Sequence, residues 1–336
     1  MLTKNTLSQV KQEFLKIGTL GLPMGLKLFL FLIILVVTMI LGIIVSLLIT
    51  GTFTAGTYES KTLVQNEFNH IFEDVSERYG QLSVQGVEFA KDLSLSIERK
   101  LNNLSIPVSD LENHPEVLED LLTSEYERAL FALQKSKSSG VFIILNTTVN
   151  KKLENAQNSR AGLFIKNMEP NILSSSSPTI LLLRGFPNIG RKNSIHLHAQ
   201  WNMEFDISNA SYYHLPIEQA QKQKLPLSRL YYWSHTTLPG TSEEVMLCSL
   251  PLIDSQGTIF GVCGFEVSSM LFKLTYMPNN SMYTRSFCML APITTDTFDT
   301  SKAMFSGGYS VRKNSLNYQT LQVRESHKTF FNYQEE

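Results

Sequence analysis

The longest apolar segment of the chain runs from Leu28 to Ile49 and contains no charged residue. A helix rises 1.5 Å per residue, so this segment spans about 33 Å, enough to cross the hydrocarbon core of a bilayer. Lysines precede the segment, whereas acidic residues begin after it at Glu59. The apolar segment predicts a transmembrane helix over residues 28–50. The positive-inside rule then predicts that residues 1–27 form a short cytoplasmic tail and that the rest of the chain lies outside.

A cleaved signal peptide is the alternative to an anchor. The apolar segment is longer than a signal-peptide core, and no clean cleavage site of small residues follows it, although Ala55 leaves that alternative open. No second apolar segment of this length occurs downstream. We expect an uncleaved, single-pass protein of the cell membrane.

A helical pattern follows a Gly/Thr-rich joint, Gly51–Gly56, and extends from about Thr57 to Asn102. Its apolar residues recur about every 3.7 positions, which is typical of a straight helix rather than a left-handed coiled coil. The pattern predicts a stalk helix over residues 57–104, and Gly86 within the stripe predicts close approach by another backbone. The stripe consists of Val64, Phe68, Ile71, Val75, Tyr79, Leu82, Gly86, Phe89, Leu93, Ile97 and Leu101.

Shorter apolar segments predict a second helix and a set of strands, which together indicate an α+β fold with antiparallel sheets. The helix is expected over Glu116–Lys135. Strands are expected at Val141–Leu145, Ala161–Ile165, Ile180–Leu183, Ile195–Trp201, Phe287–Leu290 and Leu321–Val323, with a turn at Gly307-Gly308.

The strongest local signal is a hairpin formed by Val245–Ile253 and Thr258–Val267. The Asp-to-Gly tetrapeptide between them predicts a tight turn in which Gly257 adopts a positive φ. After the second strand, Ser268-Ser269 is expected to cap a helix that ends near Tyr276.

Three cysteines form neither a disulfide framework nor a metal cluster. A two-residue turn at Ser255-Gln256 would place Cys248 opposite Cys263, whereas a bulge at Gly257 would shift the register by one residue. The sequence leaves two alternatives open, a disulfide between Cys248 and Cys263 or two buried free thiols, and it favours the free thiols.

Composition and motifs exclude several classes of function. The formal net charge is −1, so no basic field points to nucleic acid. His196-x-His198 offers a zinc-binding geometry with His214 or His235, against ordinary hydrogen-bonded histidines as the alternative. Ser310-x-x-Lys313 lacks its companion motifs, and no nucleophile elbow, phosphate loop or dinucleotide fingerprint occurs. We predict no catalytic residue, no metal and no cofactor.

The segment PLIDSQGTIFGVCG, from Pro251 to Gly264, resembles the closing hairpin of Cache-type extracellular sensor domains. With the membrane helix and the stalk, the chain resembles a double-Cache (dCache) sensor of bacterial transmembrane receptors. This resemblance implies PAS-like sheets in a membrane-distal unit, residues 105–276, and an incomplete membrane-proximal unit, residues 277–336. It also implies that the chain stops before a second membrane helix and an output domain.

Amino-acid-binding members of that family resemble Y-x(4)-R-x-W-Y followed by two acidic residues. Here the resemblance implies ligand contacts from Arg229, Tyr231, Tyr232, Trp233 and Glu266, although Tyr231 and Glu266 depart from the family's Trp and Asp. Arg229 is suited to a carboxylate and Glu266 to a cationic group. Trp201 is a further candidate at the mouth of the pocket. In the alternative, Arg229 pairs with Glu243 or Glu244 and the aromatic residues are core.

We therefore expect a non-catalytic sensor whose extracellular domain binds a small carboxylate- or amine-bearing ligand. The apolar helix would contact membrane lipid, and the stalk helix would pair with that of a second copy as a homodimer. The alternative is a surface-anchored adhesion or scaffold protein with a Cache-like body and no small-molecule ligand.

Overall fold

The computed structural model describes residues 24–50, 52–169, 179–223, 225–238, 243–277, 287–292, 297–307, 320–327 and 330–334. The chain forms two compact units, Met1–Asn69 and His70–Glu336. Gly308, half of the predicted Gly-Gly turn, lies outside the described residues.

Helix α2 (Met24–Ile49) confirms the predicted apolar helix and begins four residues earlier than expected. Its 26 residues correspond to about 39 Å, and its apolar composition suits a membrane span. Helix α3 (Thr52–Asn103) begins five residues before the predicted stalk, so the expected joint at Gly51–Gly56 is largely helical. Glycine and threonine cost a helix only about 1 kcal/mol each or less, and extending an existing helix is much easier than nucleating one.

From His70 onward, the predicted stripe of α3 is the face that packs into the core. Leu93, Ile97 and Leu101 are fully buried, and Tyr79 packs against the same cluster. Each of the buried aliphatic side chains contributes about 1.5–3 kcal/mol of transfer free energy. At Gly86 the close neighbour is a side chain and not the predicted backbone, because an added Cβ would lie 2.7 Å from Leu250 Cδ1.

The centre of the second unit is an eight-stranded sheet with the order β4-β3-β2-β1-β8-β7-β6, in which β5 also pairs with β2. All of the predicted strands of residues 141–267 are present. The strands are β1 (Gly140–Leu145), β2 (Ser159–Asn167), β3 (Ile180–Arg184), β4 (His196–Asn202), β5 (Glu204–Asp206), β6 (Tyr232–Thr237), β7 (Glu244–Ile253) and β8 (Ile259–Ser268).

One pairing differs from the expected antiparallel sheet, because β3 and β4 are parallel. A short helix, α5 (Pro187–Asn193), lies between these strands in the chain and provides the crossover that parallel neighbours require. Sequence periodicity did not predict α5, since seven residues are too few to show a helical repeat.

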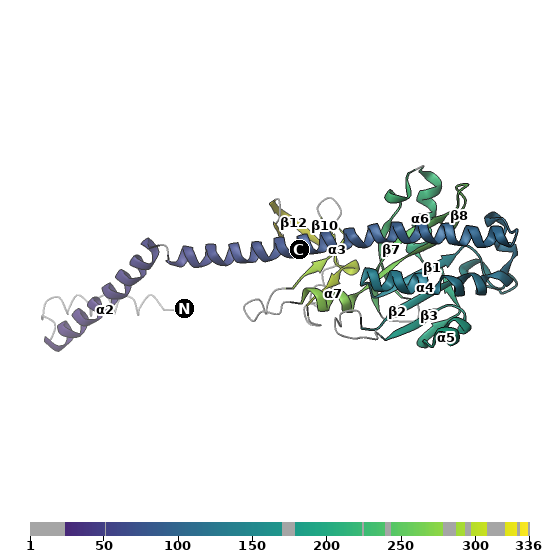
Figure 1. The fold of residues 1–336 in the computed structure, drawn as a ribbon. Helices are drawn as coiled ribbons and strands as arrows, with labels where there is room; N and C mark the ends of the chain where they lie inside the picture. The colour runs from purple at the N-terminus through teal and green to yellow at the C-terminus, as the bar shows by residue number, and fades with distance from the viewer. Residues whose placement is uncertain are drawn as a thin grey trace, which may run out of the picture. The chain divides into compact units, whose positions relative to one another are not determined.

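Helices cover both faces of this sheet. Helix α4 (Leu118–Ser136), preceded by short 3-10 turns at Val108–Asn113 and Pro115–Val117, lies beside α3 (Figure 1) and packs on β1 and β2. Helix α6 (Ser211–Lys222) packs on β6, β7 and β8 within a separate apolar cluster. Pro216 lies inside α6 and disfavours a helix locally, but burial of Tyr212, Tyr213 and Pro216 outweighs that cost.

The β7–β8 hairpin is confirmed, and Gly257 adopts the predicted positive φ of 88°. A register shift at its closed end pairs Cys248 with Phe265 and Leu250 with Cys263, so the two thiols are not opposite each other. Both cysteines are free and buried. Ser268 caps α7 (Ser269–Tyr276) as predicted, its side chain accepting a hydrogen bond from the Leu271 amide.

The remaining described strands form two small sheets. One pairs β9 (Met289–Leu290) with β11 (Met304–Phe305), and the other has the order β10-β12-β13. The latter consists of β10 (Thr297–Asp299), β12 (Thr320–His327) and β13 (Phe330–Gln334). Strand-like segments are therefore present at both predicted places, whereas the division into units at residue 277 stays a proposal.

Candidate functional site

A row of residues crosses the sheet on the side covered by α6. The strand registers place Lys166 of β2 beside Gly140 of β1, and Gly140 beside Glu266 of β8. The row continues through Leu247 of β7 to Ser234 of β6. Side chains alternate between the two faces of a sheet, and Leu247 belongs to the apolar cluster under α6. The row therefore faces α6 and not α3.

The carboxylate at the centre of this row is fully buried. Glu266 is 0% exposed, and Lys166 Nζ lies 3.1 Å from its Oε1 atom. Lys166 is itself 4% exposed in its side chain and also pairs with Glu243, whose side chain is 31% exposed. The three groups thus form a charged line from the interior of the domain toward solvent.

Burial dominates the ionisation of Glu266. Removal of the carboxylate from water raises the pKa of Glu266 to about 7, Lys166 opposes this shift, and the negative charge of Glu243 adds to it. His198 of β4 belongs to the same electrostatic environment, because burial and then the charge of Lys166 lower its pKa. The line of charge carries a titratable group close to physiological pH.

Several polar atoms on this face have no hydrogen-bond partner among the described residues. They are the Ser234 hydroxyl, the Ser249 hydroxyl and both carboxylate oxygens of Glu266, which has an ion pair with Lys166 but no well-directed hydrogen bond. Ser249 is fully buried and lies next to Gly264 and Tyr232 in the register. A buried polar atom without a partner costs about 1–3 kcal/mol, so these atoms are candidates for hydrogen bonds with a bound molecule.

The residues expected from sequence do not all gather at this place. Glu266 is central, and Tyr232 lies on the same face because it pairs with Ser249. Trp233 points to the opposite face, where its ring lies 4.9 Å from that of Tyr79 and its Nε1 donates to Ser83 Oγ. Trp233 is thus an anchor between β6 and α3.

Trp201 also packs on the α3 side, and its Nε1 donates to the Gly185 carbonyl at 3.1 Å. Arg229 and Tyr231 are exposed, with Arg229 ending a 3-10 turn, Leu227–Arg229. Within the described part of the chain Arg229 forms no ion pair, and Glu243, its alternative partner, pairs with Lys166. Only Glu266 and Tyr232 of the expected set therefore lie on the polar face.

Sequence reasoning missed Lys166, Gly140, Ser234 and Ser249. One signal was available for Lys166, because a lysine within the apolar strand AGLFIKN is rarely buried unless it is paired. Its partner was not predictable, since Glu266 lies 100 residues further along the chain.

A second polar feature is a cleft of 570 Å³ beside β5. Glu204 lines it, but its oxygens accept hydrogen bonds from Thr148, Ser159 and the Val149 amide, so this carboxylate holds the local loops together. Of the histidines weighed as zinc ligands, His198 Nδ1 accepts a hydrogen bond from the Gln200 amide, and His214 Nε2 lies 2.7 Å from the Ile207 carbonyl oxygen. No group of three or more His, Cys, Asp or Glu is placed to hold a metal within the described residues.

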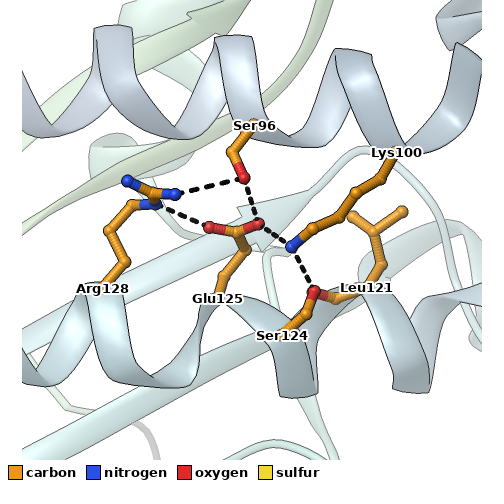
Figure 2. Close-up of polar contacts among 6 residues, drawn as sticks. All are labelled: Ser96, Lys100, Leu121, Ser124, Glu125 and Arg128. Carbon is orange, nitrogen blue, oxygen red and sulfur yellow. Dashed lines mark hydrogen bonds and ion pairs between the residues drawn. The ribbon is translucent and has the colours of Figure 1, made fainter.

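Figure 2 shows a third polar cluster, which fastens α4 to α3 around Glu125. Glu125 is 0% exposed and bonds to Ser96, Lys100 and Arg128, and although burial alone would raise its pKa, these partners lower it. Because every oxygen of this carboxylate has a partner, the cluster acts as a clamp between the helices and is not a vacant site.

No protein-family model matches the chain, and no curated protein does. Among solved structures, the chain is similar to a protein described as methyl-accepting chemotaxis protein X, with 13% identity, 69% of this chain and 71% of that chain covered, and a TM-score of 0.37. It is similar to the periplasmic sensory domain of the Campylobacter jejuni chemoreceptor Tlp1, with 10% sequence identity and a TM-score of 0.37, over 79% of this chain and 85% of that chain. It is also similar to the sensory domain of the C. jejuni chemoreceptor Tlp3 with isoleucine bound, with 13% sequence identity and a TM-score of 0.28, over 77% of this chain and 85% of that chain.

Proposed function

We propose that this chain is the extracytoplasmic input module of a membrane signalling receptor, of the double-Cache kind, and that it binds a small molecule between the sheet and α6. One observation carries the proposal: Ser234 and Ser249 place buried hydroxyls without hydrogen-bond partners among the described residues on one face of adjacent strands, beside the ion-paired carboxylate of Glu266. Each such atom in a native structure calls for an explanation, and a bound polar molecule would supply the missing partners.

The order of elements supports the same proposal. An apolar helix, α2, is followed by the long helix α3 and then by the sheet that carries the site. In this proposal α2 contacts membrane lipid, the N-terminus is cytoplasmic and ligand binding shifts α3 relative to a partner helix. The Glu125 clamp would couple α4 to α3 during that shift.

A ligand screen on the full chain in detergent tests the binding step. A true ligand is expected to raise the melting temperature in a concentration-dependent manner, because it binds only the folded state. Ser249→Ala should reduce this shift, whereas Ser94→Ala should leave it unchanged, since Ser94 lies on the α3 side and accepts a hydrogen bond from the Ile253 amide. A library of metabolites that produces no shift, or equal shifts in both variants, would refute binding at this face.

The homodimer is proposed from apolar side chains that α3 leaves exposed. Phe72, Val84 and Leu95 are 57%, 60% and 41% exposed, so these three large apolar side chains of α3 lie at the surface, where they would pack against a partner helix. Single cysteines at Glu73 or Glu77, close to Phe72 on the same helix, should cross-link between copies in membranes. A monomeric mass in detergent and no cross-link in membranes would exclude this pairing.

A further inference from the structure

The cation that faces Glu266 belongs to the chain itself. A buried carboxylate on a ligand-binding face ordinarily recruits a positive charge, because an isolated ion in a low-dielectric interior is very unfavourable. Lys166 already provides that charge at 3.1 Å and is almost as buried as Glu266.

The backbone is arranged to let Lys166 reach this position. Lys166 and Glu266 lie on β2 and β8, which are separated by β1, so their strands are about 9.5 Å apart. The residue between them is Gly140, which has no side chain. A Cβ at Gly140 would lie 2.7 Å from Glu266 Oε2, so glycine leaves the space above β1 to the lysine and the carboxylate.

The charges at the site decide which ligands it can accept. Glu266 and Glu243 carry two negative charges when ionised, and Lys166 carries one positive charge. An amine would have to displace a tethered ammonium, whose effective concentration is of the order of millimolar or more. The buried guanidinium of Arg184, which pairs with Phe164 in the register and acts on Tyr212 of α6, offsets the second negative charge on this face. The site therefore has no net positive charge to attract a carboxylate. The hydroxyls of Ser234 and Ser249 suit an uncharged ligand with hydrogen-bonding groups.

We propose that Lys166 is the specificity-determining residue of this face: its ammonium is a tethered occupant of the cation position beside Glu266, so the site rejects amines and takes an uncharged polar molecule. This inference rests on the proposed function for its biological meaning. The occupancy of the cation position by Lys166 can be tested without the natural ligand.

The test replaces Lys166 with methionine in the full chain and uses ethylammonium chloride as the probe, with sodium chloride at equal concentration as the reference. Lys166→Met keeps the apolar stem and vacates the ammonium position. We expect saturable thermal stabilisation of this variant by about 10–100 mM ethylammonium, the range in which weak small-ion affinities are measurable, and none in the wild type. Glu266→Gln added to Lys166→Met should abolish the response.

A matched control separates this effect from general ion binding. Lys135 pairs with Glu88 at the protein surface, where both side chains are about half exposed, so Lys135→Met should show no response to ethylammonium. Lys166→Arg retains the positive charge and should also show none.

Three outcomes would overturn the inference. The first is a folded Lys166→Met protein that does not respond to ethylammonium, and the second is a wild type that responds equally. The third is a Lys166→Met protein that fails to fold and is not restored by refolding with ethylammonium. A failed metabolite screen combined with a positive amine response would reject the proposed function alone, so the two failures are distinguishable.

Discussion

Replacing Ser249 with alanine is expected to stabilise the ligand-free protein, although most substitutions of buried residues destabilise. Ser249 lies in the middle of β7, is 0% exposed and has a hydroxyl with no hydrogen-bond partner within the described structure. Removing a polar group that folding strips of water removes its desolvation cost from the native state.

The size of the effect follows from two opposing terms. An unmet buried hydroxyl costs about 1–3 kcal/mol. Alanine retains the Cβ of Ser249 and leaves only a small void. Its weaker preference for strands reduces the stability gain by a few tenths of a kcal/mol. We expect a net gain of about 1 kcal/mol in the free energy of unfolding, which corresponds to roughly 2–4 °C in the melting temperature.

Chemical denaturation of the full chain in detergent, followed by tryptophan fluorescence, measures this gain. Trp233 reports on the sheet because its ring packs against Tyr79. Ser94→Ala is the matched control: Ser94 is similarly buried, but its hydroxyl accepts from the Ile253 amide at 3.1 Å. This variant should lose about 1 kcal/mol, because the amide is left without a partner.

A loss of stability in Ser249→Ala as large as that in Ser94→Ala would contradict this prediction. Such a result would mean that the Ser249 hydroxyl has a partner in the native protein, for example a bound water. It would remove the main support for an open polar site on this face.

Three further predictions concern the same sheet. The pKa of Glu266 is raised from the ordinary 4.5 to about 7, so its contribution to folding stability should be complete below pH 4.5 and should be lost as pH rises to about 7. Glu266→Gln should flatten this pH dependence of the free energy of unfolding in denaturation curves. An unchanged pH dependence would exclude Glu266 as its source. Gly140→Ala should destabilise the protein by about 1–3 kcal/mol, because the added carbon would overpack against the carboxylate of Glu266. Gly80→Ala has nothing within 4 Å of the added carbon and should stabilise α3 by about 0.5–1 kcal/mol. Equal effects of the two variants in urea titrations would contradict the geometry. Cys248 and Cys263 should react with a thiol reagent only after unfolding, since both are buried and the pKa of Cys248 is raised to about 12, and an oxidised pair on a non-reducing gel would contradict the register.

Local sequence signals predicted most of the elements correctly. The spacing of apolar residues predicted α2, α3 and α4, and the Asp-to-Gly tetrapeptide predicted the hairpin with Gly257 at positive φ. These features depend on the chain within a few residues or on a long repeat. Sequence missed the helices α5 and α6, which are short, and α6 contains Pro216, so tertiary burial outweighs their local propensity. It also missed the strands β5, β6, β10, β11 and β13.

The candidate site was predicted only in part, and the reason is the alternation of side chains along a strand. Tyr232 and Trp233 are neighbours in sequence, yet β6 directs them to opposite faces of the sheet. A cluster of aromatic residues therefore does not become one wall of a pocket. The resemblance to a sensor family singled out Glu266, which the structure places at the centre of the polar row, and its role in ligand binding stays a proposal.

The apolar helix, the long amphipathic helix and the hairpin follow from the sequence alone, because each depends on local chemistry or on a long repeat. The cation that pairs with Glu266 follows from the tertiary structure and not from any local sequence signal. The pairing of β2, β1 and β8 brings Lys166 across Gly140 to Glu266, three residues whose distance in the sequence gives no sign of contact. Strand order and register are set by the packing of the whole sheet, and they decide which cation the buried carboxylate meets.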